Sequence, residues 1–295
     1  YRTVLQTAAS LGMTVSLYDE YGFPSGSVGS RNSSDESAFA RSYPGHTLHR
    51  LDKIERMVTG PCTVELPLPD GQVEAVVAMD ALSLRRVVVE DTLVGRDDGC
   101  RVARWDVPAG IWQVMAFVCV VDGEEICDYL DPEATRGFIA LTHEEYAKRF
   151  AGHFGTTIDS TFHDEPTLYR AQGRTWTPRF ADEYRRRFGD DPRSLYPALW
   201  YDMGPETAGA RHRLFGLRTL LYAEAFAGEI DAWAASHGIV ATGHQDQEEI
   251  ENPVSVSGDL LGCFRHQAVP GIDKIGGDRP AERFYRLVAS AAVNW

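Results

Sequence analysis

The chain has 295 residues, 43% of them hydrophobic and 11% aromatic, which is typical of a globular protein with a core. Its formal net charge is -14. Such a balance disfavours nucleic acid and anionic membranes as partners, because both require a basic protein face. It is compatible with a neutral substrate such as a sugar.

The sequence contains no apolar run long enough to span a membrane, and its first residues do not resemble a signal peptide. The chain does not begin with methionine, so we expect it to be part of a longer protein. Its cysteines are odd in number and scattered, which disfavours a disulfide framework or a zinc site. Free thiols favour a cytoplasmic location, and we predict no metal ligand and no required cofactor. The cysteines are Cys62, Cys100, Cys119, Cys127 and Cys263.

The chain opens with a helix, a glycine, a strand and an acidic pair. Apolar residues at helical spacing predict a helix over residues 1–11, and Gly12 is suited to end it. Residues 13–18 form a predicted strand that ends on Asp19 and Glu20. In a barrel of alternating strands and helices the C-terminal strand ends carry the chemistry, so we expect both acids to line a sugar subsite. Helix capping or pairing with arginine explains them equally well.

A loop with three glycines, a proline and two aromatic residues follows at residues 21–29. Aromatic rings beside carboxylates suit a pyranose, whose C–H face stacks on rings while its hydroxyls bond to acids. We therefore expect Tyr21 and Phe23 to contact the sugar. An ordinary connecting loop is the alternative.

From residue 44 to residue 122 the hydrophobic period changes from helical to two, with turn signals between short β-type runs. This pattern predicts an antiparallel β domain over residues 44–122, inserted into a barrel domain made of residues 1–43 and 123–295. The predicted strands are residues 62–66, 73–79, 86–90, 101–105 and 112–118.

The acidic pair most suggestive of catalysis follows a predicted strand at residues 156–162, where Pro166 blocks further ladder pairing. We predict that Glu165 is a general acid and that Asp164 binds the sugar. Like-charge repulsion from Asp164 would raise the pKa of Glu165 and keep it protonated near neutral pH. The alternative is that Asp164 or Thr167 caps a short helix that begins at Leu168.

Two later stretches add polar side chains. A long helical pattern over residues 207–237 precedes a short predicted strand, residues 239–243, which ends in a segment rich in acids and amides. Such side chains bond to vicinal hydroxyls, so we expect His244 and Asp246 to bind the sugar. Asp273, in a further strand-end loop, joins them as a candidate.

Glycoside hydrolysis needs a proton donor and a second carboxylate on the other face of the sugar. A separation of roughly 6.5–9.5 Å admits a water molecule and gives inversion, whereas roughly 5–5.5 Å gives retention. The second carboxylate is either Glu248 or Glu249, or it lies beyond Trp295.

Six short pieces of the sequence carry a resemblance to a known family: Leu17–Glu20, Phe23–Gly26, Pro108–Trp112, Phe162–Pro166, Thr177–Phe180 and Pro270–Gly277. They resemble motifs of the family 106 glycoside hydrolases, the α-L-rhamnosidase-like proteins. The resemblance implies a (β/α)8 TIM-type barrel, complete or partial in this chain, and inverting hydrolysis of terminal α-L-rhamnosides. It also implies that Glu165 is the acid, that a later strand carries another active-site glutamate, and that calcium is an admissible ligand.

Two alternatives remain open at this point. A non-catalytic carbohydrate-binding remnant of the same fold would retain the aromatic and acidic subsite without a working acid/base pair. A retaining β-glycosidase would place an acid and a nucleophile at two strand ends of a similar barrel. Because one barrel serves many reactions, the fold alone does not separate them.

Overall fold

The computed structural model describes residues 1–20, 22–29, 37–90, 93–95, 101–123, 125–248, 253–273 and 282–295. It is a mixed α/β structure with one parallel and one antiparallel sheet. The chain divides into two compact units. Unit 1 consists of Tyr1–Leu48, Gly123–Gly173 and Thr219–Trp295, and unit 2 of His49–Asp122 and Arg174–Arg218.

Unit 1 is built on a four-stranded parallel sheet in the order β1 (Val15–Tyr18), β7 (Ile158–His163), β9 (Val240–Gly243) and β10 (Val269–Pro270). The register places Tyr18 beside Phe162, and Phe162 beside Thr242. The carboxyl ends of the strands therefore meet at one edge. The strands predicted at residues 13–18, 156–162 and 239–243 are confirmed.

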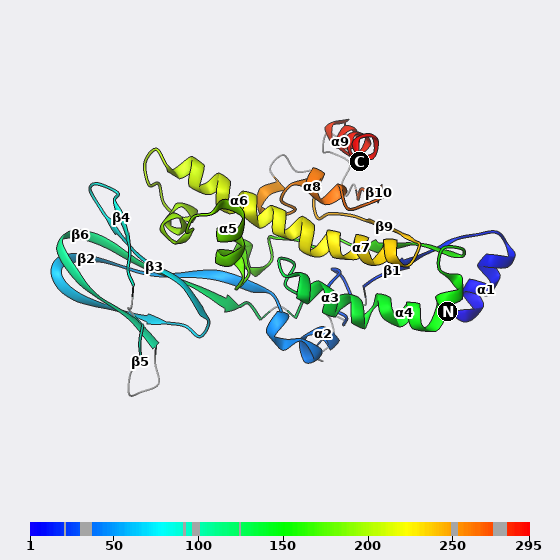
Figure 1. Cartoon of the computed structure of the whole chain (residues 1–295), viewed down its shortest axis with the longest axis horizontal. Coiled ribbons are helices and arrows are strands. Elements are labelled where there is room, and N and C mark those ends of the chain that lie inside the picture. The colour runs from blue at the N-terminus through cyan, green and yellow to red at the C-terminus, as the bar shows by residue number, and fades with distance from the viewer. Residues whose placement is uncertain are drawn as a thin grey trace. The chain divides into compact units, whose positions relative to one another are not determined.

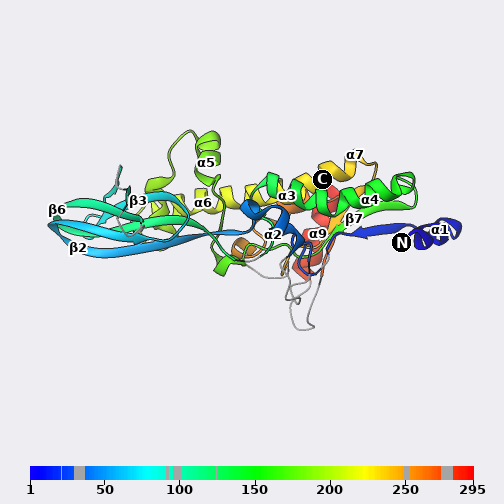
Figure 2. The same ribbon diagram turned by 90° about the horizontal axis from the view of Figure 1, so that it is seen from below.

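Helices cover one face of this sheet, as Figure 2 shows for α3 (Pro132–Leu141), α4 (His143–Phe150) and α7 (Glu229–Ser236). Side chains alternate along a strand, so every second residue faces these helices. Leu17 and Thr161 are accordingly buried, whereas Tyr18 and Val240 on the opposite face are exposed.

The helix predicted over residues 207–237 is divided into three parts. It comprises α6 (Thr207–Tyr222), a π-helical turn η5 (Ala223–Gly228) and α7. A π-helical turn within a helix often marks a functional site. The other helical elements of unit 1 are α1 (Arg2–Ser10), α2 (Ala38–Ser42), η1 (Pro44–His46), η2 (Ala151–His153), η3 (Ala171–Gly173), η6 (Pro253–Ser255), α8 (Leu260–Phe264) and α9 (Glu282–Asn294).

Unit 2 contains the predicted antiparallel strands. β2 (His49–Leu68) and β6 (Arg101–Val121) pair along almost their whole length, and β3 (Gln72–Asp80) lies on the other side of β6 (Figure 1). Two separate predicted strands, 101–105 and 112–118, are one continuous strand. The register shift between Gly60 and Cys62 absorbs the proline between them, because a bulge leaves a residue without a ladder partner. β4 (Arg86–Val88), β5 (Leu93–Gly95) and β8 (Thr175–Trp176) complete the sheet.

Unit 2 also takes in residues Arg174–Arg218, which the sequence analysis assigned to the barrel domain. β8 pairs with β2, and Trp176 stacks on Phe180 at a centroid distance of 3.7 Å. Tyr196 packs edge-on against both Trp176 and Phe117 of β6. Aromatic packing thus attaches α5 (Phe180–Phe188) and η4 (Arg193–Leu199) to the β-sheet.

The parallel sheet has fewer strands than the eight of the predicted barrel, which therefore stays a prediction. Within the described ranges, no helix combines the length and the apolar character needed to cross a bilayer.

Candidate functional site

The carboxyl edge of the parallel sheet in unit 1 gathers the acidic side chains that the sequence singled out. Parallel strands carry their C-terminal loops to the same edge, which is why residues far apart in the sequence meet there. Tyr21 and Glu249 lie outside the described residues. The candidates that do lie there are Asp19 and Glu20 after β1, Asp164 and Glu165 after β7, His244, Asp246 and Glu248 after β9, and Asp273 after β10.

Asp164 is an ionised carboxylate within this group. Its Oδ1 lies 3.3 Å from His244 Nδ1, and the Tyr18 hydroxyl donates to its Oδ2 over 2.5 Å. Burial opposes the charged form, but the hydrogen bonds from His244 and Tyr18 outweigh it and hold the pKa of Asp164 below its ordinary value. His244 responds in the opposite sense: burial disfavours its cation, yet Asp164 raises the pKa of its imidazole.

Two aromatic residues that the sequence analysis did not select stand beside Asp164. Tyr18 and Phe162 are neighbours across β1 and β7, with ring centroids 5.7 Å apart and an interplanar angle of 20°. His244 meets the Phe162 ring edge-on at 4.8 Å. Tyr18 is 46% exposed, and its hydroxyl also contacts Glu20. Side chains alternate along each strand, and this alternation puts both rings on the sheet face opposite the helices. That pattern could have identified the two residues from the sequence.

Glu165 differs from its neighbour in both environment and charge. It is 9% exposed, and its pKa is raised to about 7, first by burial and then by the charges of Asp246, Asp164 and Asp273. The raised pKa was predicted, but the largest cause is burial and not repulsion from Asp164. Near neutral pH, Glu165 is therefore partly protonated beside an ionised Asp164.

Glu248 is more deeply buried, at 3% exposure. Its Oε1 accepts a hydrogen bond of 2.9 Å from the Gln245 backbone N–H, and its Oε2 has no hydrogen-bond partner in the described part of the chain. Burial is the main reason that its pKa rises to about 8. Glu248 therefore holds a proton at neutral pH and accepts one only above about pH 8.

Asp19, which follows β1 at the carboxyl edge of the sheet, is buried, with 4% of its surface exposed. The hydroxyl of Ser25 donates to its Oδ1 over 2.5 Å, and burial raises the pKa of Asp19 well above its ordinary value. In this position Asp19 supports the loop at Ser25. Of the other predicted sugar contacts, the side chain of Phe23 is 43% exposed and the side chain of Asp246 is buried.

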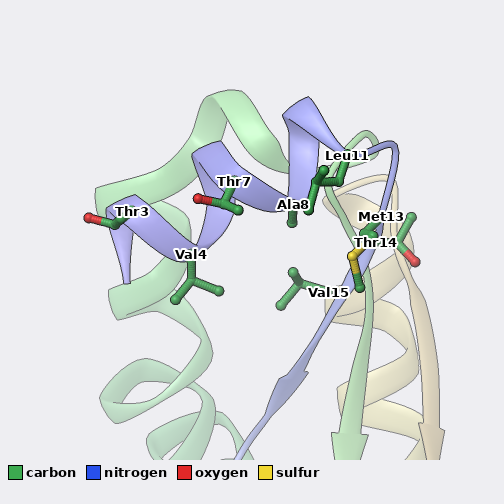
Figure 3. Close-up of a pocket in the computed structure, with 8 residues that line it drawn as sticks. All are labelled: Thr3, Val4, Thr7, Ala8, Leu11, Met13, Thr14 and Val15. Carbon is green, nitrogen blue, oxygen red and sulfur yellow. The ribbon is translucent and has the colours of Figure 1, made fainter.

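A hollow of about 360 Å³ lies elsewhere in unit 1, at the amino end of β1 (Figure 3). Its lining is apolar apart from threonine hydroxyls, and it contains no ionisable side chain. It therefore offers no acid/base chemistry. The lining residues are Thr3, Val4, Thr7, Ala8, Leu11, Met13, Thr14 and Val15.

No three His, Cys, Asp or Glu side chains within the described ranges are arranged to hold a metal ion. Calcium, which the motif resemblance admits as a ligand, stays a prediction.

No protein-family profile and no curated protein matches this chain. Among solved structures, a rhamnosidase from Novosphingobium sp. PP1Y matches with a TM-score of 0.46 and 18% sequence identity. The match covers 62% of this chain and 18% of that one, so the chain spans less than a fifth of the length of that rhamnosidase.

Proposed function

We propose that unit 1 carries the proton-donating half of a glycoside hydrolase site, with Glu165 as the general acid. The observation that carries the proposal is the contrast between two adjacent carboxyls. Glu165 keeps a proton to about pH 7, while Asp164 is held ionised by His244 and Tyr18. Neighbouring carboxyls with pKa values pushed apart are the usual basis for assigning an acid in a glycosidase.

The protonation state suits the reaction. A general acid works best when its pKa lies near the operating pH, because it is then protonated and still a good donor. Glu165 meets that requirement near neutrality. The exposed ring of Tyr18 and the ring of Phe162 at the same edge are suited to the apolar C–H face of a sugar.

Three finer parts of the proposal are supported by the motif resemblance alone. They are a (β/α)8 barrel around the site, terminal α-L-rhamnosides as substrates, and inversion at the anomeric carbon. For the base, Glu248 is disfavoured because it holds its own proton to about pH 8. We propose a base outside the described residues, with Glu249 as the candidate in this chain.

The test is a turnover assay on aryl glycosides, with an α-L-rhamnoside first in the panel and NMR following the product anomer. It uses this chain and a version extended at both ends by its parent sequence. We expect the extended protein to turn over the rhamnoside with inversion. Glu165→Gln should then lose about 10²–10⁴-fold in kcat, the usual contribution of a general acid.

The matched control is Glu145→Gln on α4, which removes a carboxylate that pairs with Lys148 and Arg149 of the same helix. It should leave turnover unchanged. Sugar binding without turnover by either protein would contradict the proposal and favour the non-catalytic carbohydrate-binding alternative. Retention at the anomeric carbon would favour the β-glycosidase type of mechanism instead.

A further inference from the structure

The backbone of Glu165 is strained. Its φ is 46°, in the left-handed region where L side chains other than Asn and Asp are uncommon. Glutamate has no local hydrogen bond that favours this conformation. Such a residue persists only when the surrounding structure holds it, and such residues cluster at functional sites. The contacts that hold Glu165 are therefore informative.

The residue before Glu165 is fixed through both of its backbone polar groups. Asp164 N–H donates to Ser25 Oγ over 2.8 Å, and Ser25 N–H donates to the Asp164 carbonyl over 3.1 Å. Ser25 is itself fully buried, and its carbonyl accepts a hydrogen bond of 2.7 Å from Tyr129. The turn therefore has a rigid attachment on its amino side.

The residue after Glu165 is held by a tyrosine side chain. The Tyr222 hydroxyl, at the end of α6 just before the π-helical turn, donates to the Pro166 carbonyl over 2.5 Å. The same hydroxyl lies 2.8 Å from Gln245 Oε1, and the Gln245 amide nitrogen lies 3.1 Å from His163 Nε2. Tyr222 is 1% exposed, so no water competes for these contacts.

We infer that Tyr222 is a positioning residue for Glu165, and that its hydroxyl, opposite Ser25, locks the left-handed turn that presents the Glu165 carboxyl. The importance of this contact for catalysis rests on the proposed function. The effect of the Tyr222 hydroxyl on the backbone of the turn does not depend on that function. Without the hydroxyl, the Pro166 carbonyl loses its partner and the turn relaxes toward a right-handed or extended backbone. The Glu165 carboxyl then leaves its buried position, and the pKa of Glu165 falls, because burial is its largest cause.

The experiment is Tyr222→Phe, which removes one oxygen and keeps the ring that packs edge-on against Tyr129. The pKa of Glu165 is measured by NMR titration of ¹³C-labelled glutamate carboxyls, with Glu165→Gln to assign the signal. In the unmodified protein we expect a pKa of about 7. In Tyr222→Phe it should fall by at least about one unit, a tenfold change in proton affinity. In the active protein, the alkaline limb of the pH profile should move down in pH by the same amount, with kcat falling and KM unchanged.

Tyr184→Phe is the control, because Tyr184 is an equally buried tyrosine in unit 2. It should leave the Glu165 titration and the pH profile unchanged. A Tyr222→Phe protein in which Glu165 titrates as in the parent would overturn the inference. A shifted titration in a protein that turns over no glycoside would support the positioning role and remove the proposed function, so the two failures are distinguishable.

A second measurement compares the stability of two variants at Glu165 itself. Glycine tolerates a positive φ and alanine does not. The ratio of folded to unfolded protein should therefore be higher for Glu165→Gly than for Glu165→Ala. The difference should be about threefold once glycine's greater unfolded-state entropy is included. In a Tyr222→Phe background the order should reverse, because a relaxed turn favours alanine. Equal stability of Glu165→Gly and Glu165→Ala in the parent would show that the turn is not held under strain and would overturn the inference.

Discussion

In the proposed function, the dependence of catalysis on pH follows from the environment of Glu165. The protonated form is the active one, so kcat/KM should be level on the acid side and fall tenfold per pH unit above the pKa of about 7. At pH 7 about half of the molecules then carry the proton, whereas a carboxyl with an ordinary pKa would be only about 0.3% protonated. Burial and the neighbouring carboxylates therefore contribute a factor of about 150 in the available acid at neutral pH.

The assay compares two substrates of the extended protein between pH 5 and pH 9. A glycoside with a poor leaving group needs the proton and should show the alkaline limb near pH 7. A dinitrophenyl glycoside leaves without protonation, so its limb should be weak or absent, and Glu165→Gln should cost it far less. An alkaline limb that survives in Glu165→Gln, or one centred near pH 4.5, would refute the reasoning.

Three further predictions concern stability. Glu74 is buried in unit 2 with a pKa raised to about 7, chiefly by burial, so the folded state binds its proton more tightly than the unfolded state. As pH rises from about 4.5 through 7, ionisation of Glu74 should lower the free energy of unfolding by up to about 3 kcal/mol. Urea unfolding of Glu74→Gln should not show that decrease. The same dependence of unfolding free energy on pH in both proteins would contradict the prediction. Asp19→Asn should likewise flatten the fall in stability at high pH, because burial raises the pKa of Asp19 and asparagine still accepts from Ser25. Gly243→Ala should lower Tm at a cost of about 1–3 kcal/mol, because its Cβ would lie 2.5 Å from the His163 carbonyl; an unchanged Tm would contradict this packing.

The parts of the site that depend on strand direction could be predicted from the sequence. Asp19, Asp164 and His244 each follow a run of β-type residues, and three parallel strands necessarily bring their carboxyl ends to one edge. The hydrophobic periods of the sequence also distinguished correctly the part of the chain that forms the parallel sheet from the part that forms the antiparallel sheet. Local pattern was enough because each of these features is a property of a few consecutive residues.

The features that tune the site could not be predicted, since each depends on contacts between distant residues. Tyr222 lies 56 residues from Pro166, and Ser25 lies 139 residues from Asp164. The left-handed backbone of Glu165 runs against the preference of glutamate, so propensity pointed away from it. The attachment of residues 174–218 to unit 2 likewise depends on aromatic packing across the fold.

Burial changes the effective charge of this edge from what the sequence suggests. Seven acidic residues in the described part of the chain follow the strands of unit 1 there, and a count of formal charges would give a strongly anionic site. Instead, the pKa of Asp19 is raised well above its ordinary value, Glu248 holds its proton to about pH 8 and Glu165 to about pH 7, while His244 lies 3.3 Å from Asp164. Near neutral pH the site is therefore less negative than its composition suggests, and it becomes more negative as pH rises through 7 and 8. A neutral sugar can bind to such a site without paying for charge repulsion, whereas a uronic acid or a sugar phosphate would meet growing repulsion above pH 7. The same protonation that makes Glu165 a donor thus also favours an uncharged substrate.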